Sequence, residues 1–196
     1  MKKLQIQDIS KRYGDTVVFE RFSCTLHPGE VNVLFGASGS GKTTLLRLIM
    51  GLEEADEGSL NSFEQLRFSA VFQEDRLCNN LSAFSNVMLV VESSISSEQI
   101  QKALVAVGLG DAIRKPAKEL SGGMRRRVAL VRALFATYDL LILDEPFKGL
   151  DELTKKQVIA YTLERTKDKT VILVTHDLEE AKLLGAKHVI NLETIA

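Results

Sequence analysis

The sequence is poor in the features that mark secreted, disulfide-stabilised or membrane-spanning chains. Its 196 residues include two cysteines, three prolines and no tryptophan. Cys24 and Cys78 stand far apart without a metal-type spacing, so we expect two reduced thiols. No apolar run approaches the ~20 residues that cross a bilayer, and the start turns polar at Gln7 and Asp8, before a signal-peptide core forms. We therefore expect a chain that neither spans a membrane nor is secreted.

An excess of charge of either sign is also missing. Lysine and arginine number 25, aspartate and glutamate number 26, and the formal net charge is −1. The chain thus lacks the basic surplus that marks nucleic-acid-binding domains. The one basic run, residues 125–127, is interpreted as the solvated face of a helix. The length and the absence of repeats or linkers favour a single domain over residues 1–196, with no nucleic-acid partner.

The most informative segment is a glycine-rich loop that fills every fixed position of the phosphate-binding pattern G-x-x-x-x-G-K-[ST]. It reads Gly36, Ala37, Ser38, Gly39, Ser40, Gly41, Lys42 and Thr43, and Thr44 follows it. Backbone N–H groups of such a loop surround phosphates, the lysine neutralises the terminal phosphates and the Thr43 hydroxyl binds Mg²⁺. A Gly/Ser turn with no ligand would need no lysine there. We predict a nucleoside triphosphate site with Mg²⁺.

The spacing of apolar residues predicts an α/β fold. We expect strands near residues 4–9, 17–19, 22–26, 31–35, 68–72, 140–143, 171–174 and 189–190, and helices over 44–50, 97–107, 121–136, 151–165 and 178–184. Residues 140–143 are all apolar, which is typical of a parallel strand covered on both faces. The front of the chain predicts a small antiparallel patch.

Polar residues follow several of these strands, at the edge where α/β sheets bind their ligands. Asp144 and Glu145 come directly after residues 140–143. We assign Asp144 to Mg²⁺ and Glu145 to the general base that activates water. Gln73 and His176 follow two other apolar runs, and we expect Gln73 at Mg²⁺ or the attacking water and His176 at the γ-phosphate. Asp151 is either a nucleotide contact or only a helix cap.

The segment Leu120-Ser121-Gly122-Gly123-Met124 resembles the signature sequence of ATP-binding cassette (ABC) proteins. Other features also occur in the order that is typical of that family, namely an aromatic residue, the phosphate loop, a glutamine, the signature and the later acidic residues. The resemblance therefore covers essentially the whole chain. It implies the P-loop NTPase fold, with a mainly parallel core sheet, a small antiparallel β subdomain and a helical signature subdomain at approximately 78–138. No C-terminal regulatory domain is expected after Ala196.

The resemblance also implies how ATP is bound. Two cassettes pair head to tail around two ATP molecules, and Tyr13 stacks on the adenine. Ser121, Gly122 and Gly123 contact the γ-phosphate that the partner's Lys42 holds. A helix start of this kind presents N–H groups and a positive dipole end to an anion. Ser121 acting simply as a helix cap is compatible with this role.

A finer resemblance is to bacterial importers of the nitrate, sulfonate and taurine group. It implies an ATPase at the cytoplasmic face of the cell membrane, peripheral to it, with a transmembrane permease subunit, a second nucleotide-binding domain and, indirectly, a solute-binding protein. Two residues depart from the family pattern: Met124 replaces the usual glutamine, and Lys148 stands at the expected dimer seam where serine or glycine is common. Two alternatives stay open, namely a soluble ABC-type ATPase in cofactor or complex assembly and a nucleotide-gated module without hydrolysis. The intact Lys42, Asp144, Glu145 and His176 oppose the second.

Overall fold

Parallel strands form the centre of the molecule. The computed structural model describes residues 3–192, and its larger sheet has the strand order β5-β6-β7-β3-β8. These strands are β5 (Phe68–Val71), β6 (Leu140–Asp144), β7 (Thr170–Val174), β3 (Val31–Phe35) and β8 (His188–Asn191). Every neighbouring pair runs parallel, and β6 and β7 are buried along their whole length. The predicted parallel core sheet is confirmed.

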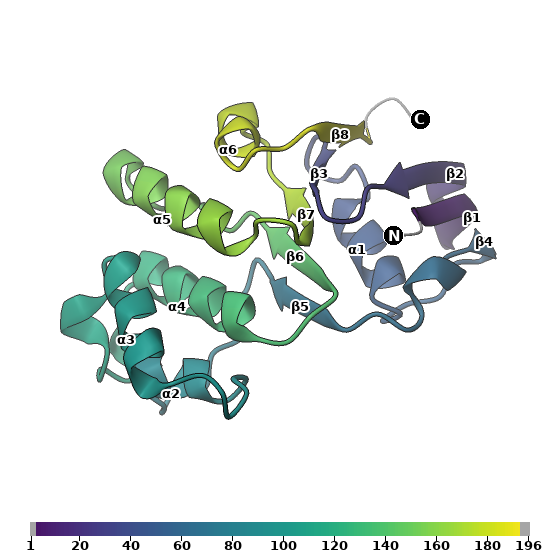
Figure 1. The fold of residues 1–196 in the computed structure, drawn as a ribbon. Helices are drawn as coiled ribbons and strands as arrows, with labels where there is room; N and C mark the ends of the chain where they lie inside the picture. The colour runs from purple at the N-terminus through teal and green to yellow at the C-terminus, as the bar shows by residue number, and fades with distance from the viewer. Residues whose placement is uncertain (1–2, 193–196) are drawn as a thin grey trace.

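The two faces of this sheet are covered by different elements (Figure 1). Leu141 and Leu143 of β6 pack into the same core as α4 (Gly122–Phe135) and α5 (Glu152–Arg165). Leu140 and Ile142, the alternate residues of β6, pack on the other face with α1 (Lys42–Ile49) and the antiparallel strands. Successive side chains of a strand point to opposite faces, so an apolar run without alternation is what a doubly covered strand needs.

The smaller sheet is antiparallel, with the order β2-β1-β4. It contains β1 (Leu4–Tyr13), β2 (Thr16–Leu26) and β4 (Glu57–Ser59). The prediction of separate strands at 17–19 and 22–26 was wrong, because one strand covers both. Arg21 takes a left-handed φ of 50° there, and register shifts in the β1–β2 ladder absorb the irregularity as bulges without ending the strand. The sequence pattern did not predict β4.

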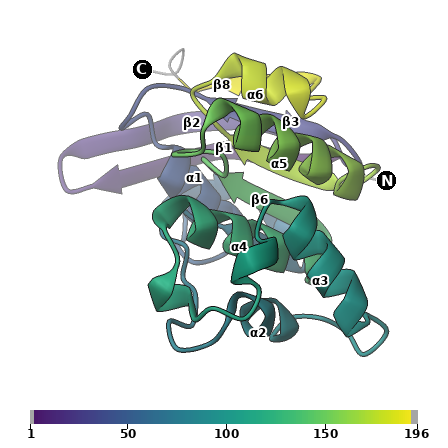
Figure 2. The same cartoon turned by 90° about the vertical axis from the view of Figure 1, so that its left-hand side faces the viewer.

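Three helices form a group on the side of the sheet away from β1 and β2 (Figure 2). They are α2 (Ala83–Met88), α3 (Ser97–Ala106) and α4, and α6 (Leu178–Leu183) lies beside β8. The short helix α2 was not predicted; the fully buried Asn86 side chain bonds to three carbonyls around it. None of the helices within residues 3–192 has the length and apolar character to cross a bilayer.

The parallel arrangement determines where polar residues can meet. Leu34 and Asp144 both pair with Val174, and Val71 pairs with Leu143. The chain segments that follow β5, β6, β7 and β3 therefore leave the sheet at one common edge, which we call the carboxyl edge. The turn that precedes β3 and the first residue of β8 lie at the opposite, amino edge.

Candidate active site

The largest group of predicted site residues lines one pocket at the carboxyl edge, with a volume of about 610 Å³. Its lining residues are Tyr13, Val18, Gly36, Ala37, Ser38, Gly39, Gly41, Lys42, Thr43, Thr44, Gln73, Glu145, Lys148 and His176. Asp144 lies beside it, in a smaller cavity of about 190 Å³ that Thr43 and Gln73 also line. The structure thus brings together segments that follow four different strands. Ser40 lines a neighbouring hollow with Gly39.

The glycine loop is shaped by close packing as well as by backbone angle. Gly39 and Gly41 have φ values of 85° and 87°, where a side chain is strained. A Cβ at Gly41 would also lie 2.8 Å from Phe19 and Val18 side-chain atoms, whereas at Gly39 nothing lies within 4 Å. Gly41 therefore allows the loop to rest directly on β2, and Gly39 supplies only the turn.

Lys42 is well suited to hold an anion. Its Nζ donates to the carbonyl oxygens of Gly36 and Ala37, at 2.7 and 2.5 Å. Within residues 3–192 no carboxylate forms an ion pair with it. The cation is thus folded over its own loop at the start of α1, where helix N–H groups add positive potential. A positive charge without an ion-pair partner, beside the N–H groups at a helix start, fits phosphate.

Glu145 is held by contacts with Val174, Lys148 and His176. Its backbone takes a left-handed φ of 46° and its N–H donates to the Val174 carbonyl at 2.9 Å, which ties it to β7. Its Oε2 lies 2.6 Å from Lys148 Nζ, and its Oε1 lies 3.5 Å from His176 Nδ1. Burial alone would raise the pKa of Glu145, but the pairing with Lys148 and His176 outweighs it and leaves the pKa below its ordinary value. The carboxylate is therefore ionised and ready to accept a proton.

Asp144 has a different environment from its neighbour. Its side chain is buried, and burial together with the nearby Glu145 carboxylate raises its pKa. No cation forms an ion pair with it among the described residues. With Thr43 and Gln73 it supplies a carboxylate, a hydroxyl and an amide oxygen around one small cavity. All three are oxygen ligands of the type that Mg²⁺ takes, so the residues present fit that ion.

The signature residues lie outside the pocket of their own chain. Ser121 caps α4 by accepting a hydrogen bond from the Met124 N–H at 3.3 Å. Asp151 caps α5 in the same way, with the Thr154 N–H at 3.0 Å. A Cβ at Gly123 would lie 3.5 Å from the Gly149 carbonyl oxygen, so the starts of α4 and α5 are neighbours. The cap function expected for both residues is present, and a nucleotide contact stays a prediction for Ser121, Gly122, Gly123 and Asp151.

The interpretation of residues 125–127 as a solvated face was wrong. Arg126 donates to the backbone carbonyls of Phe72 and Gln73 and pairs with Asp75 at 3.3 Å. Arg127 donates to the carbonyl of Val107 at 2.7 Å. Guanidinium groups satisfy carbonyl oxygens that lie beyond the ends of strands and helices, so these arginines fasten the Gln73 segment and the end of α3 to α4. In the sequence, the acidic Asp75 shortly after Gln73 was the one sign that an arginine would pair with this segment.

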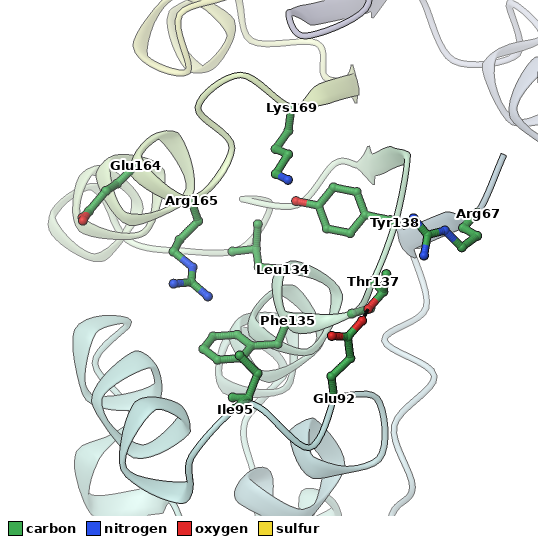
Figure 3. Close-up of a pocket in the computed structure, with 11 residues that line it drawn as sticks. Arg67, Glu92, Ile95, Leu134, Phe135, Thr137, Tyr138, Glu164, Arg165 and Lys169 are labelled. Carbon is green, nitrogen blue, oxygen red and sulfur yellow. Dashed lines mark hydrogen bonds between the residues drawn. The ribbon is translucent and has the colours of Figure 1, made fainter.

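A second cavity, of about 540 Å³, lies away from the glycine loop, where α4 ends and β6 begins (Figure 3). Arg165 and Lys169 point into it, while Glu164 points outward (Figure 3). The Arg165 guanidinium lies 4.5 Å from the centre of the Phe135 ring. This cavity shares no lining residue with the pocket at the carboxyl edge, and we assign it no part in the same chemistry.

Comparisons with known proteins bear on the family and the fold. Residues 19–148 match the family model described as ABC transporter. The chain is 40% identical over 189 residues to the aliphatic sulfonates import ATP-binding protein SsuB 2 of Pseudomonas syringae, covering 95% of this chain and 68% of that protein. It is 37% identical over 191 residues to an uncharacterized ABC transporter ATP-binding protein of Haemophilus influenzae, covering 94% and 80%. A dimeric bacterial ABC transporter cassette of known structure superposes with a TM-score of 0.79 at 24% identity, covering 97% of this chain and 94% of that one, which establishes the fold.

Proposed function

Because the chain belongs to the ABC transporter family, we propose that it binds and hydrolyses ATP as the peripheral subunit of a membrane importer, at the cytoplasmic face of the membrane. The observation that carries the proposal is that Lys42, Glu145 and His176, from three separate segments, line one pocket. A phosphate-binding cation, a carboxylate base and a polarising histidine are the groups that triphosphate hydrolysis needs.

The pocket accounts for ATP binding from adenine to γ-phosphate. The N–H groups of residues 36–44 and the Lys42 ammonium hold the phosphates. Tyr13 is 46% exposed at the rim, and its hydroxyl donates to Glu53. That hydrogen bond holds the ring in place as a stacking surface for the adenine. The positions of Tyr13 and of most loop residues in the lining of the pocket support these roles.

The neighbouring carboxylates of Asp144 and Glu145 have different roles in the proposed hydrolysis. Thr43, Gln73 and Asp144 would hold Mg²⁺, which neutralises phosphate charge when bound. Glu145 accepts the proton of the attacking water at its carboxylate, and its lowered pKa keeps it ionised for that step. His176 is 69% exposed in its side chain and donates to the γ-phosphate from the open side of the pocket. The bond of Arg126 to the Gln73 carbonyl keeps that segment in place.

A second copy of the cassette completes the site. Ser121, Gly122, Gly123 and Asp151 do not line the pocket of their own chain. A Cβ at Gly122 would meet nothing within 4 Å, so the start of α4 is open to an approaching phosphate. We assign these four residues to the ATP bound by the partner subunit. ATP between two subunits then acts as a shared ligand, and its hydrolysis weakens the pair.

The transported solute is proposed from the relatives. Proteins with about 40% identity carry names that refer to aliphatic sulfonate import, so we infer an organic sulfonate or a related oxyanion. The permease subunit would contact Leu52, which lines the same 190 Å³ cavity as the proposed Mg²⁺ ligands, together with Met50 and Phe72. Leu52 is 64% exposed there, an apolar side chain that a partner would cover.

The membrane role can be tested by purifying the tagged chain from detergent-solubilised membranes of its own cells. We expect a polytopic membrane subunit to be recovered with it. Vesicles that contain the complex should take up a labelled alkanesulfonate only when ATP is present. Recovery of the chain alone, or a complex without ATP-dependent uptake of any sulfonate, nitrate or taurine, would contradict the proposed transport function.

Glu145→Gln tests the catalytic base and the dimer together. The amide cannot accept the proton, so we expect ATP hydrolysis to fall by about 10²–10⁴-fold with binding retained. Light scattering should show an ATP-dependent dimer that persists longer than in the parent. The matched control is Glu164→Gln, an exposed glutamate of α5 remote from the pocket, which should hydrolyse ATP at the parental rate. A Glu145→Gln protein with parental turnover would remove Glu145 from its role.

Lys148→Ala tests whether the Lys148 ammonium lowers the pKa of Glu145. The Lys148 ammonium lowers the pKa of Glu145, so its removal raises that pKa and the base protonates at higher pH. We expect the acidic limb of the kcat–pH profile to move to higher pH in Lys148→Ala. Lys148→Arg, which retains the charge, should keep the limb near its parental position. Identical acidic limbs in the Ala variant and the parent would mean that the pair of Lys148 with Glu145 does not persist during turnover.

A further inference from the structure

Two of the chain's three histidines meet at the amino edge of the sheet, opposite the nucleotide pocket. His27 and Glu30 belong to the turn between β2 and β3, and His188 is the first residue of β8. The imidazole rings of His27 and His188 stack with their centres 3.6 Å apart and an angle of 6° between the planes. One ligand atom from each of the three residues lies within 4.8 Å of the other two.

The backbone around this cluster is held firmly. The Asn32 side chain, fully buried, accepts from the His27 N–H at 2.7 Å and donates to the carbonyls of His27 and Glu30 at 3.0 and 3.1 Å. Asn32 is also the register partner of His188 in the β3–β8 ladder. One buried amide therefore links the turn that carries two of the side chains to the strand pair that carries the third. Little backbone order would be lost on binding a ligand there.

We propose that His27, Glu30 and His188 bind one transition-metal dication, with Zn²⁺ as the expected ion. Two imidazoles and one carboxylate form a ligand set that suits zinc, while Mg²⁺ and Ca²⁺ prefer oxygen ligands throughout. Water completes the tetrahedron. This site is separate from the Mg²⁺ site at the carboxyl edge, and the inference does not depend on the proposed function.

The surroundings leave the ligand atoms accessible. Glu30 Oε1 pairs with Lys187 Nζ at 3.2 Å, and Oε2 shares a hydrogen bond with His188 Nε2. A metal bound to Oε2 and Nε2 would take the place of the proton between them. Zinc bonds of about 2.0–2.2 Å place tetrahedral ligand atoms about 3.4 Å apart, so Glu30 Oε2 and His188 Nε2, which now form a hydrogen bond, must separate while the His27 ring turns toward them. The three side chains are partly exposed, so rotation about their side-chain bonds can bring this about without moving the strands.

The binding would fasten the β2–β3 turn to β8. Both flank β3, whose other end carries the glycine loop. A ligand that binds only the folded state stabilises it by RT ln(1 + L/Kd), where L is the free ligand concentration. Zinc is therefore expected to raise the melting temperature of the chain in the absence of nucleotide.

The experiment is a calorimetric titration of the metal-free, nucleotide-free full chain with Zn²⁺, followed by thermal denaturation with and without the ion. We expect one Zn²⁺ per chain, an affinity at least ~10-fold lower in His27→Ala and in His188→Ala, and a zinc-dependent melting shift that both variants lose. The matched control is His176→Ala, which removes the remaining histidine and should bind Zn²⁺ as the parent does. Co²⁺ in place of Zn²⁺ should give the visible absorption bands of a tetrahedral site.

Each contrary result overturns the inference. The absence of saturable binding would leave the two histidines as a stacked pair only. Equal loss of affinity in His176→Ala would show that binding is not specific to this cluster. Binding that disappears in Cys78→Ser would assign the ion to that exposed thiol. If the metal-free His188→Ala protein melts far below the parent, Glu30→Gln provides the second variant, and unchanged zinc affinity in it would also count against the site.

Discussion

Parallel pairing of β5, β6, β7 and β3 is the constraint on which the site depends. It brings the segments that follow these strands to one edge, so that residues far apart in the chain become neighbours without a specific attraction between them. The bond from the Glu145 N–H to the Val174 carbonyl extends the pairing one residue beyond β6. A register slip of one residue would turn the alternate side chains of β6 to the wrong faces, and it would move Glu145 away from the glycine loop. Burial of β6 and β7 on both faces opposes such a slip.

The sheet and the glycine loop position the residues of the proposed site, and a local ion pair also lowers the pKa of one of them, Glu145. Lys42, whose Nζ lies 2.7 Å from the Gly36 carbonyl oxygen, is positioned by the loop itself. The ion pair of Lys148 with Glu145, at 2.6 Å, depends on a residue outside the loop motif. It favours the ionised carboxylate and contacts one of its oxygens, so the lysine at the expected dimer seam acts on the proposed catalytic base.

How much of this could be predicted from sequence differs from element to element. The glycine loop and the polar residues after strands were predictable, because sheet topology alone brings such positions together and the motif has fixed chemistry. The joined strand β2 was not, since bulges at Arg21 depend on pairing with β1. The contacts of the α4 arginines could not be predicted either. Arg126, for example, donates to backbone carbonyls that lie 53 and 54 residues away in the chain. Carbonyl acceptors have no sequence signature, so long-range contacts of this kind become visible only in the fold.

The central claim is that the pocket at the carboxyl edge binds ATP through the Lys42 ammonium and the surrounding N–H groups. The most direct test is calorimetric titration of Lys42→Ala with ATP and Mg²⁺, with Lys102→Ala as control because that lysine is exposed on α3. A charge-assisted bond to phosphate contributes about 1.5–3 kcal/mol, so the account predicts an ATP affinity at least ~10-fold lower in Lys42→Ala and unchanged in the control. Parental ATP affinity in Lys42→Ala would contradict it.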